Sequence, residues 1–398
     1  MQIHLNRYVI LALSVFLANL SDINETHARS YEQGSFTLKL EEFGARCDGK
    51  TDDTQAITRW LSAVDPHGNS ILVARPGRCV FTRALSLPAG GASNISLRGA
   101  GPYSTVFVYA GKADDIDLLT IGDGRSAYTQ FSIGDFSLTS TTPMIAGSAL
   151  HLRGLQRSLV SNIIIDGQEG TGNFWNGIWF DGIDSIVTSG QNYATAKRDA
   201  VRVNGLKDLG MADLTLSGWK ISPPNGQISN KNQVGLHIGG GFGGLYCTGG
   251  TDIIGNGTNV VIDKTLNFSL PNREAAFDGM CAIDSSAFGP GLALNEVGGN
   301  NYLSFSGSWI ASSHTDGIFI ARGATGWISY TGGTIYNNGR DGVHDESGSV
   351  LQSYSGTIFR HNGRSGSGVG IRSAKSTDLV HLQVRFDTNA SGDTATLP

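Results

Sequence analysis

One short element recurs along most of this 398-residue chain, and such a repeat constrains the fold more than any single motif does. Its clearest copies are TDGIFIARG and RDGVHDESG, which begin at Thr315 and Arg340, 25 residues apart. Further copies are DLLTIGD, SALHLRG, NGIWFDG, DAVRVNG, VGLHIGG and DGMCAID, which begin at Asp117, Ser148, Asn176, Asp199, Val234 and Asp278. The spacing ranges from 23 residues (177 to 200) to 44 residues (235 to 279), so short turns of the repeat alternate with turns that carry long loops.

Within each copy, two apolar residues are separated by one other residue, which is the spacing that places both on the same side of a strand. These pairs are Leu150 and Leu152, Ile178 and Phe180, Val201 and Val203, Leu236 and Ile238, and Ile318 and Ile320. Stacked coils would bury all the pairs in one apolar column, and each coil would hydrogen-bond only to its neighbours. The sequence therefore predicts an all-β fold, a right-handed parallel β-helix of roughly ten coils. A β-sandwich is the alternative, but it needs no parallel element at every repeat.

A short helix is predicted before the first coil, within the stretch FGARCDGKTDDTQAITRWL that begins at Phe43. The apolar residues at helical spacing are Ala56, Ile57, Trp60, Leu61 and Val64. Asp52 stands three residues before Gln55, which is the spacing of a capping box. We therefore expect Asp52 and Asp53 to start this helix rather than to take part in catalysis.

The same stretch resembles the FGAxGDGxTDDTxAI signature of the pectate lyase superfamily. The segment ILVARPGRCVFTRALSLPAG, from Ile71, is similar to the next segment of that family, and the resemblance covers about residues 40 to 100. It implies a right-handed parallel β-helix with an N-terminal capping helix, as in polysaccharide-degrading enzymes and phage tailspike depolymerases. The Asn-Thr-Asp, Gly-His-Gly and Arg-Ile-Lys motifs of the polygalacturonases are absent, so the resemblance implies a fold and not one reaction.

The N-terminal residues 1–28 are predicted to be a signal peptide, and the protein is expected to be secreted or periplasmic. Arg7 precedes an apolar core from about Tyr8 to Leu17, which is too short to span a membrane, and an uncleaved anchor is the alternative. Residues 29–100 are predicted to form the cap and the first coils. Residues 101–398 are predicted to form the β-helix, with long loops between 150 and 300 and an irregular C-terminal end.

Cysteine content and charge restrict the partners and the compartment. In an exported chain, Cys47, Cys79, Cys247 and Cys281 could form two disulfides, one of which would join Cys47 to Cys79, and free buried thiols are the alternative. The net charge of −5 gives no reason to expect nucleic acid as a partner, since phosphate binding needs clustered Lys and Arg. No membrane contact is expected beyond the signal peptide, and the sequence makes no prediction about oligomeric state.

Residues between the inward pairs are predicted to point outward and to stack into rows on one face. The first row should read Thr120, His151, Trp179, Arg202, His237, Cys281, Phe319 and His344. The second row, two residues further along each strand, should read Gly122, Arg153, Asp181, Asn204, Gly239, Ile283, Ala321 and Glu346. Substrate is expected along the middle coils, because these carry the longest insertions and the densest charge. The strip of Phe319, His344 and Glu346 is the next candidate.

A sugar polymer suits this pattern of side chains. Aromatic rings pack against pyranose faces, whereas Asn and Arg bind hydroxyl and carboxylate groups. The predicted substrate-binding residues are His151, Arg153, Trp179, Arg202, Asn204 and His237. The predicted catalytic residues are Asp181, Asp184 and Asp199. The aspartates of the other Asp-Gly pairs, Asp278, Asp316 and Asp341, are expected to form turn hydrogen bonds instead.

Three functions fit these residues. The leading hypothesis is an exported enzyme that hydrolyses glycosidic bonds with two of the predicted carboxylates, without a cofactor or a metal. Such carboxyl groups lie about 5 to 5.5 Å apart for retention or roughly 6.5 to 9.5 Å apart for inversion. The first alternative is a lyase that cleaves a uronic-acid polymer by β-elimination, with or without Ca²⁺. The second alternative is a surface protein that binds glycans without catalysis.

Overall fold

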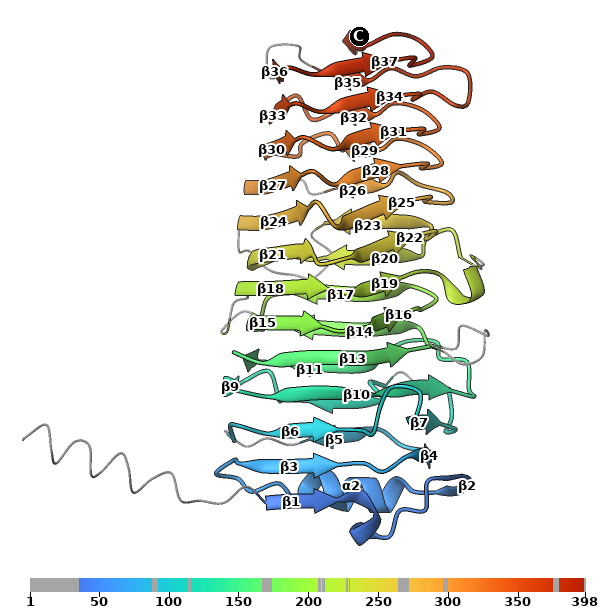
Figure 1. Cartoon of the computed structure of the whole chain (residues 1–398), viewed down its shortest axis with the longest axis vertical. Helices are drawn as coiled ribbons and strands as arrows, with labels where there is room; N and C mark the ends of the chain where they lie inside the picture. The colour runs from blue at the N-terminus through green and yellow to red at the C-terminus, as the bar shows by residue number, and fades with distance from the viewer. Residues whose placement is uncertain are drawn as a thin grey trace, which may run out of the picture.

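The computed structural model describes residues 36–87, 92–113, 116–166, 174–206, 209, 212–226, 228, 230–263, 272–295, 300–374 and 379–396. These residues form an elongated column of stacked coils that runs from the N-terminal cap to the C-terminal end (Figure 1). The predicted signal peptide, residues 1–28, lies outside the described residues. Within the described ranges, no helix is both long enough and apolar enough to cross a membrane.

One face of the column is a 12-stranded parallel sheet, which we call the ladder sheet. Its strands are β5 (Leu85–Leu87), β8 (Leu119–Ile121), β11 (Ser148–Arg153), β14 (Asn176–Asp181), β17 (Asp199–Asn204), β20 (Val234–Ile238), β23 (Thr258–Ile262), β26 (Leu292–Leu294), β29 (Ile318–Ile320), β32 (Val343–Asp345), β35 (Ile371–Ser373) and β38 (Thr394–Thr396). All the predicted inward pairs of this sheet are fully buried. The prediction of a parallel β-helix is confirmed, with about 11 turns.

The remaining strands form a 26-stranded sheet that bends into two further faces. The strands of the wide face are β1 (Phe36–Lys39), β3 (Ser70–Val73), β6 (Ser96–Arg98), β15 (Asp184–Ser189), β18 (Ala212–Ser217), β21 (Phe242–Thr248), β24 (Asn272–Asp278), β27 (Asn300–Ser306), β30 (Gly326–Thr331), β33 (Val350–Ser355) and β36 (Leu379–Leu382). The strands of the narrow face are β2 (Asp48–Asp52), β4 (Gly77–Phe81), β7 (Thr105–Tyr109), β16 (Asn192–Ala194), β19 (Trp219–Ile221), β22 (Thr251–Ile254), β25 (Cys281–Asp284), β28 (Trp309–Ala311), β31 (Thr334–Tyr336), β34 (Ile358–Arg360) and β37 (Arg385–Asp387). The long strands β10 (Ser132–Ser140) and β13 (Leu159–Ile165) run through both faces, and the short strands β9 (Tyr128–Thr129) and β12 (Leu155–Gln156) complete the sheet.

Glycine is required at the corner between the wide and narrow faces. Gly218 and Gly333 stand at this corner with φ of 69° and 70°, a region that side chains with a Cβ rarely adopt. A Cβ on Gly218 would lie 2.0 Å from the carbonyl oxygen of Gly190, and one on Gly333 would lie 2.1 Å from that of Ser308. Both contacts are with the coil below, so stacking at the corner depends on glycine. This requirement accounts for part of the chain's unusual content of 55 glycines.

The predicted cap helix is α2 (Thr54–Ser62), which buries Ala56, Ile57, Trp60 and Leu61 over the first coil. Asp52 accepts hydrogen bonds from the Thr54 backbone N–H (2.9 Å) and from the Thr82 hydroxyl (2.9 Å). The predicted capping box is wrong in detail, because the helix begins at Thr54 and Asp53, not Asp52, is its N-cap residue. The remaining helical segments are the short 3-10 turns η1 (Leu40–Phe43) and η2 (Pro224–Gly226).

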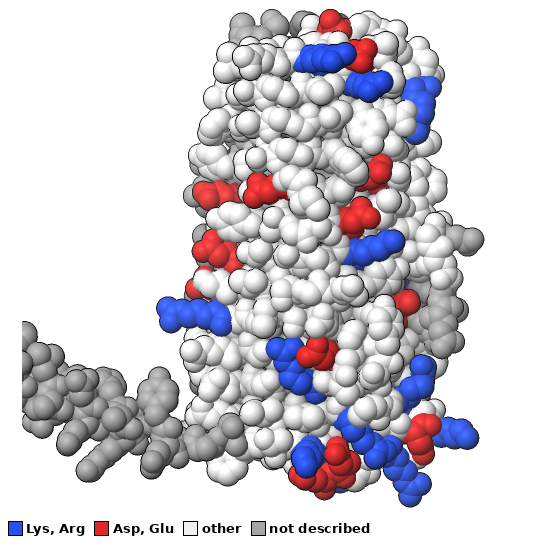
Figure 2. Space-filling model, in the orientation of Figure 1, with Lys and Arg blue, Asp and Glu red and all other residues white. Residues whose placement is uncertain are grey.

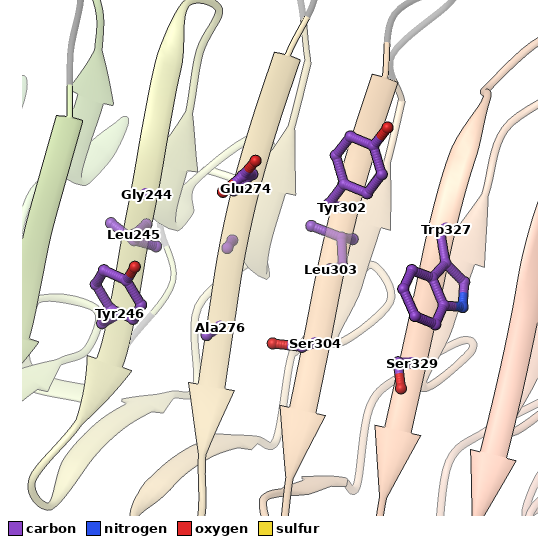
Figure 3. Close-up of a pocket in the computed structure, with 11 residues that line it drawn as sticks. Gly244, Leu245, Tyr246, Glu274, Ala276, Tyr302, Leu303, Ser304, Trp327 and Ser329 are labelled. Atoms are coloured by element: carbon purple, nitrogen blue, oxygen red, sulfur yellow. The ribbon is translucent and has the colours of Figure 1, made fainter.

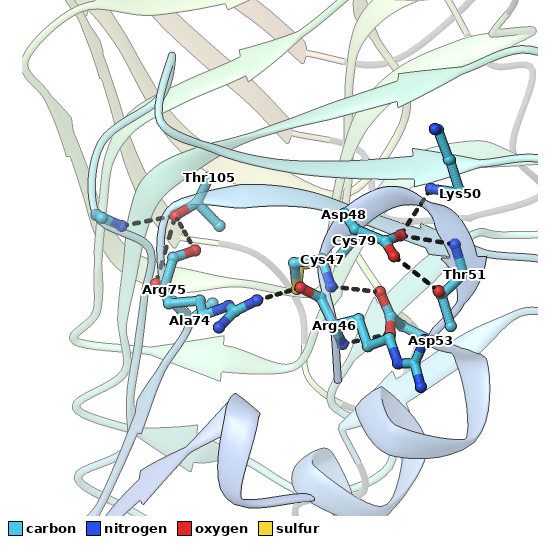
Figure 4. Close-up of a disulfide and its surroundings, with 11 residues drawn as sticks. Arg46, Cys47, Asp48, Lys50, Thr51, Asp53, Ala74, Arg75, Cys79 and Thr105 are labelled. Atoms are coloured by element: carbon cyan, nitrogen blue, oxygen red, sulfur yellow. Dashed lines mark hydrogen bonds between the residues drawn. A yellow bond between two sulfur atoms is a disulfide. The ribbon is translucent and has the colours of Figure 1, made fainter. Parts of the chain in front are cut away.

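Asp53 is buried and fixes the segment that precedes the helix (Figure 4). Its carboxylate accepts hydrogen bonds from the backbone N–H groups of Arg46 (2.7 Å) and Cys47 (2.9 Å). Cys47 in turn forms a disulfide with Cys79 of β4, and this bridge joins the cap to the first coil. These contacts agree with the expected structural role of the aspartate pair.

The second disulfide joins Cys247 of β21 to Cys281 of β25. Both cysteines are buried, and the bridge joins consecutive coils near the corner between the wide and narrow faces, where their Cα atoms are 5.6 Å apart. The expectation of two disulfides, one of them between Cys47 and Cys79, is therefore confirmed over the alternative of free thiols.

Part of the predicted repeat is wrong, because the copy DGMCAID does not belong to the ladder sheet. Cys281 begins β25 on the narrow face, and β23 and β26 occupy the ladder positions that the sequence reading missed. Val261 follows His237 after 24 residues, so the predicted 44-residue turn does not exist. The longest interval between consecutive outward positions is 35 residues, from Arg202 to His237. The expected concentration of very long insertions in the middle coils is therefore wrong.

The C-terminal end was expected to be irregular, but the described residues there keep the ladder register. Ile371 of β35 pairs with Val343 of β32 and with Thr394 of β38. The wide and narrow faces continue to the same end, where β36 pairs with β33 and β37 with β34.

Candidate functional site

The outward row of the ladder sheet carries a stack of four side chains in its middle coils. His151, Trp179, Arg202 and His237 stand on β11, β14, β17 and β20 and are paired in strict register. We call these four residues the central stack. The His151 ring lies parallel to the Trp179 indole, with centroids 4.1 Å apart and an interplanar angle of 4°. The Arg202 guanidinium lies 4.6 Å from the Trp179 ring centroid, on the coil at the other side.

This stacking corrects the role expected of Trp179. The indole was predicted to offer a flat face to a sugar ring, but His151 and Arg202 occupy the coils on its two sides. The coil spacing of about 4.8 Å leaves no room for a pyranose between them. Trp179 therefore positions its neighbours, and a cation over an indole ring is an electrostatically favourable arrangement.

His151 lies between two carboxylates and is almost fully buried. Its Nδ1 is 2.7 Å from Asp117 Oδ2, and its Nε2 is 3.2 Å from Asp181 Oδ2. Burial alone would lower the pKa of this imidazole, but hydrogen bonds to the two aspartates outweigh burial and raise the pKa. Both ring nitrogens already face a carboxylate, so neither is open to a substrate.

His237 repeats this arrangement three coils further along the column. Its Nδ1 is 3.0 Å from Asp199 Oδ2, and its Nε2 is 3.0 Å from Asp263 Oδ1. Burial again acts to lower the pKa, whereas the hydrogen bonds and charges of the two aspartates raise the pKa of His237 to about 9. The stack therefore has an imidazole at each end, fixed between a pair of aspartates that raises its pKa.

A hydrogen-bond network joins five of the predicted site residues. The Asp181 carboxylate accepts from His151, from Arg153 Nε (3.4 Å) and from Asn204 Nδ2 (2.5 Å). Asn204 Oδ1 accepts a hydrogen bond from the Trp179 indole N–H. The sequence correctly predicted that these side chains share one face, and the structure brings them together.

Arg202 is the exception in this network. It is half-buried, and among the described residues it has no carboxylate within ion-pair distance and no hydrogen-bond partner, so its buried Nε is unsatisfied. Burial lowers the pKa of Arg202, and the negative charge of Asp199 partly opposes this effect. The guanidinium nevertheless stays charged at all physiological pH values. An anionic group on a ligand would supply the partner that the described part of the chain does not.

The predicted catalytic pair of Asp181 and Asp199 is wrong on geometry. Asp199 pairs with Asn176 at the start of β14, whereas Asp181, at the end of the same strand, pairs with Asn204. The two carboxylates therefore stand at opposite ends of neighbouring strands, five residues apart. At about 3.3 Å per residue this is roughly 16 Å, beyond either spacing that a hydrolase uses.

Asp184 does not belong to this site. It begins β15 on the wide face, where it pairs with Gln156 and Ala212. Its carboxylate accepts a hydrogen bond from the Ser185 hydroxyl (2.9 Å). The sequence predicted that Asp184 lies beside Asp181, because only two residues separate β14 from β15. The residue types do not show that the chain turns from one face to another between these strands.

Sequence reasoning missed two aspartates of the site, Asp117 and Asp263. Asp117 stood in the first copy of the repeat, but nothing marked it as the partner of a histidine on the next coil. Asp263 was missed because the segment TNVVID, from Thr258, has no Asp-Gly before it. A period of two predicts which side of a strand a residue occupies. It does not identify a ladder strand that has no Asp-Gly pair before it.

The other Asp-Gly aspartates were expected to bond within their own turns. Asp316 instead pairs with Arg340 Nη2 (2.5 Å), and Asp341 pairs with Arg372 Nε (2.7 Å), so each binds a cation of the following coil. Asp278 is exposed at the end of β24 on the wide face. The expected turn role is therefore wrong for Asp316 and Asp341, which stabilise the stacking of coils.

The strip that was predicted as the next candidate is less suited to a ligand. His344 lies 3.1 Å from Asp341 and 3.5 Å from Glu346, and tilted ring contact joins it to Phe319. The ligand atoms of Asp316, Asp341 and His344 lie close enough together to hold a metal ion. However, Arg340 and Arg372 already neutralise both carboxylates, so this donor set does not fit a cation.

A groove of about 430 Å³ on the wide face was also missed. Figure 3 shows the rings of Tyr246 on β21, Tyr302 on β27 and Trp327 on β30, around the small side chains that form the floor, with β24 between the first two strands. The floor residues are Ala276, Ser304 and Ser329. Each of the three rings is more than two fifths exposed, as carbohydrate-binding aromatic side chains are. No Asp-Gly pair precedes their strands, so the sequence did not predict how these strands align.

Comparisons with known proteins identify the fold. No family model and no curated protein matches the chain. The A-module of the mannuronan C-5 epimerase AlgE4 from Azotobacter vinelandii matches with a TM-score of 0.63 and 14% identity, over 90% of this chain and 96% of that one. The catalytic unit of a GH87 α-1,3-glucanase from Streptomyces thermodiastaticus matches with a TM-score of 0.53 and 15% identity, over 92% and 71% of the two chains.

A tailspike protein of an Acinetobacter phage also matches, with a TM-score of 0.50 and 12% identity over 89% of this chain. The match covers 59% of the tailspike, so this chain spans less than two thirds of its length. At such low identities the likeness concerns the fold alone. The chain has the fold of the pectin-lyase-like parallel β-helix proteins, as the sequence resemblance implied.

Proposed function

We propose that this chain is an exported enzyme that acts on an acidic polysaccharide, and that the polymer binds along the central stack. The observation that carries this proposal is Arg202, a half-buried guanidinium without a carboxylate partner among the described residues. A planar guanidinium held against an indole ring binds a carboxylate with defined geometry. Uronic acids supply one carboxylate per sugar, so a uronic-acid polymer is the substrate class that fits.

The reaction we propose is β-elimination: a base removes the C5 proton of a uronate, the C4–O4 glycosidic bond breaks, and a C4=C5 double bond forms. The departing oxygen takes a proton from water. Charge develops on the uronate carboxylate as the proton leaves, and Arg202 would stabilise this charge in a largely water-excluded site. Asp199 is our candidate for the base: its Oδ2 is 3.0 Å from His237 Nδ1, and its buried Oδ1 accepts no hydrogen bond among the described residues and lies 3.8 Å from Arg198 Nε. Polymer binding would have to expose this carboxylate. One matched structure, the mannuronan C-5 epimerase, is named for an acidic polysaccharide, which supports the substrate class.

Hydrolysis at the central stack is less well supported. A glycoside hydrolase needs one protonated carboxyl group and one carboxylate at a defined spacing. Asp117, Asp181, Asp199 and Asp263 each lie 2.7 to 3.2 Å from a histidine ring nitrogen, so each already has a partner within the stack. The predicted pair is also roughly 16 Å apart, as the register requires.

Calcium was expected as a possible cofactor of a lyase. Ca²⁺ takes six to eight oxygen ligands, most of them carboxylates and carbonyls. The four aspartates around the stack are already bound by imidazole N–H groups, so the described residues there do not fit a calcium ion. We therefore propose elimination that depends on Arg202 rather than on a metal held at this site.

Export to an oxidising compartment is part of the proposal. Both disulfides are structural, and bridges of this kind persist outside the cytosol. The predicted signal peptide would direct the chain to the periplasm or to the outside of the cell.

The proposal is tested by incubating the protein with a panel of uronic-acid polysaccharides. Elimination produces an unsaturated uronate that absorbs in the near ultraviolet, so we expect this absorbance to increase on at least one polymer. Arg202→Ala should reduce the rate by about 100-fold or more, as removal of one charge-stabilising donor does in other enzymes. Arg385→Ala, which changes an exposed arginine of β37, is the matched control and should leave the rate unchanged.

Two results would contradict the proposal. A panel on which no polymer yields an unsaturated product, although the protein binds the polymers, would support the alternative of a non-catalytic glycan-binding protein. Full activity in Arg202→Ala would show that the substrate carboxylate binds elsewhere.

A further inference from the structure

A second groove runs along the outer surface of the narrow face, away from the ladder sheet. It consists of three adjoining hollows of about 600, 380 and 410 Å³. The first and second share Tyr193 and Lys220, and the second and third share Asp252, so together they form one continuous groove. Most of the surface seen in Figure 2 is uncharged, whereas this groove contains both acidic and basic groups.

The outward residues of the narrow face form a row along the groove. The register pairs Tyr193 with Lys220, Lys220 with Asp252, Asp252 with Ala282, and Ala282 with Trp309. An aromatic ring therefore stands near each end of the row, and the two rings are four coils or about 19 Å apart. Trp309 is 48% exposed, although burial of so large an aromatic side chain would be energetically favourable. The small side chain of Ala282 on the neighbouring strand leaves open space beside it. Exposed rings along an open groove are suited to stacking against sugars.

Two aspartates on neighbouring strands, Asp252 of β22 and Asp284 of β25, line this groove. Asp284 lies two residues beyond Ala282 on β25, on the same outward side, because Ile283 between them is fully buried. Asp252 is therefore one coil and two residues from Asp284, which corresponds to about 8 Å between their Cα atoms. Two outward side chains on Cα atoms at this separation can place their carboxyl groups at the roughly 6.5 to 9.5 Å that inverting glycosidases use.

The surroundings of the two groups differ as a general acid and a general base require. Burial raises the pKa of Asp252, and the charge of Asp284 raises it further, whereas Lys220 on the preceding coil acts to lower it. Asp252 accepts no hydrogen bond from the described residues, so nothing in them fixes its ionised form. Asp284 accepts a hydrogen bond from the Ser285 hydroxyl (3.0 Å). Two carboxyl groups in unlike environments are the usual acid and base of such a site.

We infer that this groove is a second carbohydrate site, in which Asp252 and Asp284 hydrolyse a glycosidic bond with inversion at C1. The Asp252 carboxyl gives its proton to the glycosidic oxygen as the bond between C1 and that oxygen breaks. The Asp284 carboxylate takes a proton from a water molecule as the water oxygen bonds to C1. One water is consumed, one new reducing end and one new hydroxyl are formed, and solvent exchange restores the two protonation states.

The charge of the groove indicates the class of substrate. Asp166, Asp252 and Asp284 line it against one lysine, Lys220. An acidic groove repels a polyanion, so the substrate of this site is a neutral polysaccharide, unlike the acidic polymer proposed for the central stack. The two sites are therefore distinguished by both substrate and product.

The test uses the whole protein and a panel of neutral polysaccharides that includes α-1,3-glucan, xylan and glucomannan. We expect new reducing ends without near-ultraviolet absorbance, and proton NMR should show the inverted anomer as the first product. Asp252→Asn and Asp284→Asn should each lower this rate by about 100-fold to 10,000-fold, the usual contribution of a general acid or base. Trp309→Ala should raise KM and leave kcat nearly unchanged. All three variants change groups that are at most half-buried, so each should fold, and thermal unfolding checks this.

Asp387→Asn, on β37 of the same face, is the matched control and should hydrolyse at the parent rate. Elimination on acidic polymers should be unchanged in Asp252→Asn and Asp284→Asn, and Arg202→Ala should leave hydrolysis unchanged. The inference is overturned if no neutral polymer gains reducing ends, if both aspartate variants keep the parent rate, or if the first product retains its anomeric configuration.

Discussion

At the scale of single residues, the charge of the central stack depends on how each imidazole is enclosed. His237 has a pKa of about 9 in the folded protein and an ordinary pKa of 6.5. The folded state therefore binds this proton more tightly than the unfolded chain does. The resulting stabilisation is complete below pH 6.5 and is lost as pH rises through 9, and it amounts to roughly 3 kcal/mol.

This linkage gives a prediction about pH. The free energy of unfolding of the parent, measured by urea denaturation, should fall between about pH 6.5 and pH 9. His237→Gln cannot bind the proton and should show a much smaller fall over the same range. His381→Gln is the control, because burial lowers the pKa of His381 and its stabilising effect cannot lie in this window. Equal slopes for the parent and His237→Gln would contradict the assigned charge.

Trp179 should affect catalysis through Arg202 rather than by touching the substrate. Its ring fixes the guanidinium at 4.6 Å, and a desolvated contact of this kind is worth about 0.5 to 2 kcal/mol. Trp179→Ala should therefore weaken binding of the acidic polymer by roughly 2-fold to 30-fold, which corresponds to that energy. The measurement is the dissociation constant for a uronate oligosaccharide, and Trp309→Ala on the narrow face should not change it. A larger loss than in Arg202→Ala would indicate direct contact between the indole and the sugar.

The residues of the central stack show what sequence reasoning could reach. Alternation along a strand was enough to place His151, Trp179, Arg202 and His237 in one row, because the period of two is fixed by strand geometry. The choice of an acid pair failed because it needs the position along the strand as well as the face. Asp199 is the first residue of its strand, whereas Asp181 is the last residue of the neighbouring strand. The two therefore lie at opposite edges of the ladder sheet.

At the scale of the elements, the capping helix depends on two aspartates with different surroundings. Asp53 is buried and holds two backbone N–H groups, whereas Asp52 is partly exposed and holds Thr54 and Thr82. Asp53→Asn should lower the free energy of unfolding by about 1 to 3 kcal/mol, because an amide cannot accept both bonds as a carboxylate does. Asp52→Asn should cost about 1 kcal/mol. Turnover per folded molecule should stay the same in both, and its loss in a folded variant would contradict the structural role.

The disulfide between Cys247 and Cys281 should stabilise the column, because it joins two consecutive coils. It closes a loop of 34 residues, for which the loss of chain entropy predicts about 3 to 4 kcal/mol. The double variant Cys247→Ala and Cys281→Ala should unfold at lower denaturant concentration by a corresponding amount. Reducing agent should lower the stability of the parent more than that of the double variant, which keeps only the bridge between Cys47 and Cys79. Equal stability of the parent and the double variant would show that the second bridge contributes nothing.

The missed strands have a clear physical cause. β23 and β26 belong to the ladder sheet without an Asp-Gly pair before them, while Cys281 on the narrow face follows such a pair closely. The marker indicates a turn and not a face. Apolar alternation is the same on all three faces, so a single sequence cannot assign a strand to one of them when the loops vary in length.

At the scale of the whole molecule, one coil repeated along an axis produces three faces with separate chemistry. The ladder sheet holds the central stack, the wide face holds the aromatic groove, and the narrow face holds Asp252 and Asp284. The sequence predicted the column because the inward residues repeat. It could not predict the rows of the other two faces, since these rows form only when coils of unequal length are aligned.

This separation predicts that the two proposed sites act independently. A continuous apolar core lies between the ladder sheet and the narrow face, and changes at distant sites without shared partners are usually additive. In the double variant Arg202→Ala with Asp252→Asn, elimination on an acidic polymer should fall as far as in Arg202→Ala alone. Hydrolysis of a neutral polymer should fall as far as in Asp252→Asn alone. Both rates can be measured on one preparation, by near-ultraviolet absorbance and by reducing ends. If either single variant lowers both rates in a folded protein, the two groups serve one site, and the assignment of separate substrates to the two faces is wrong.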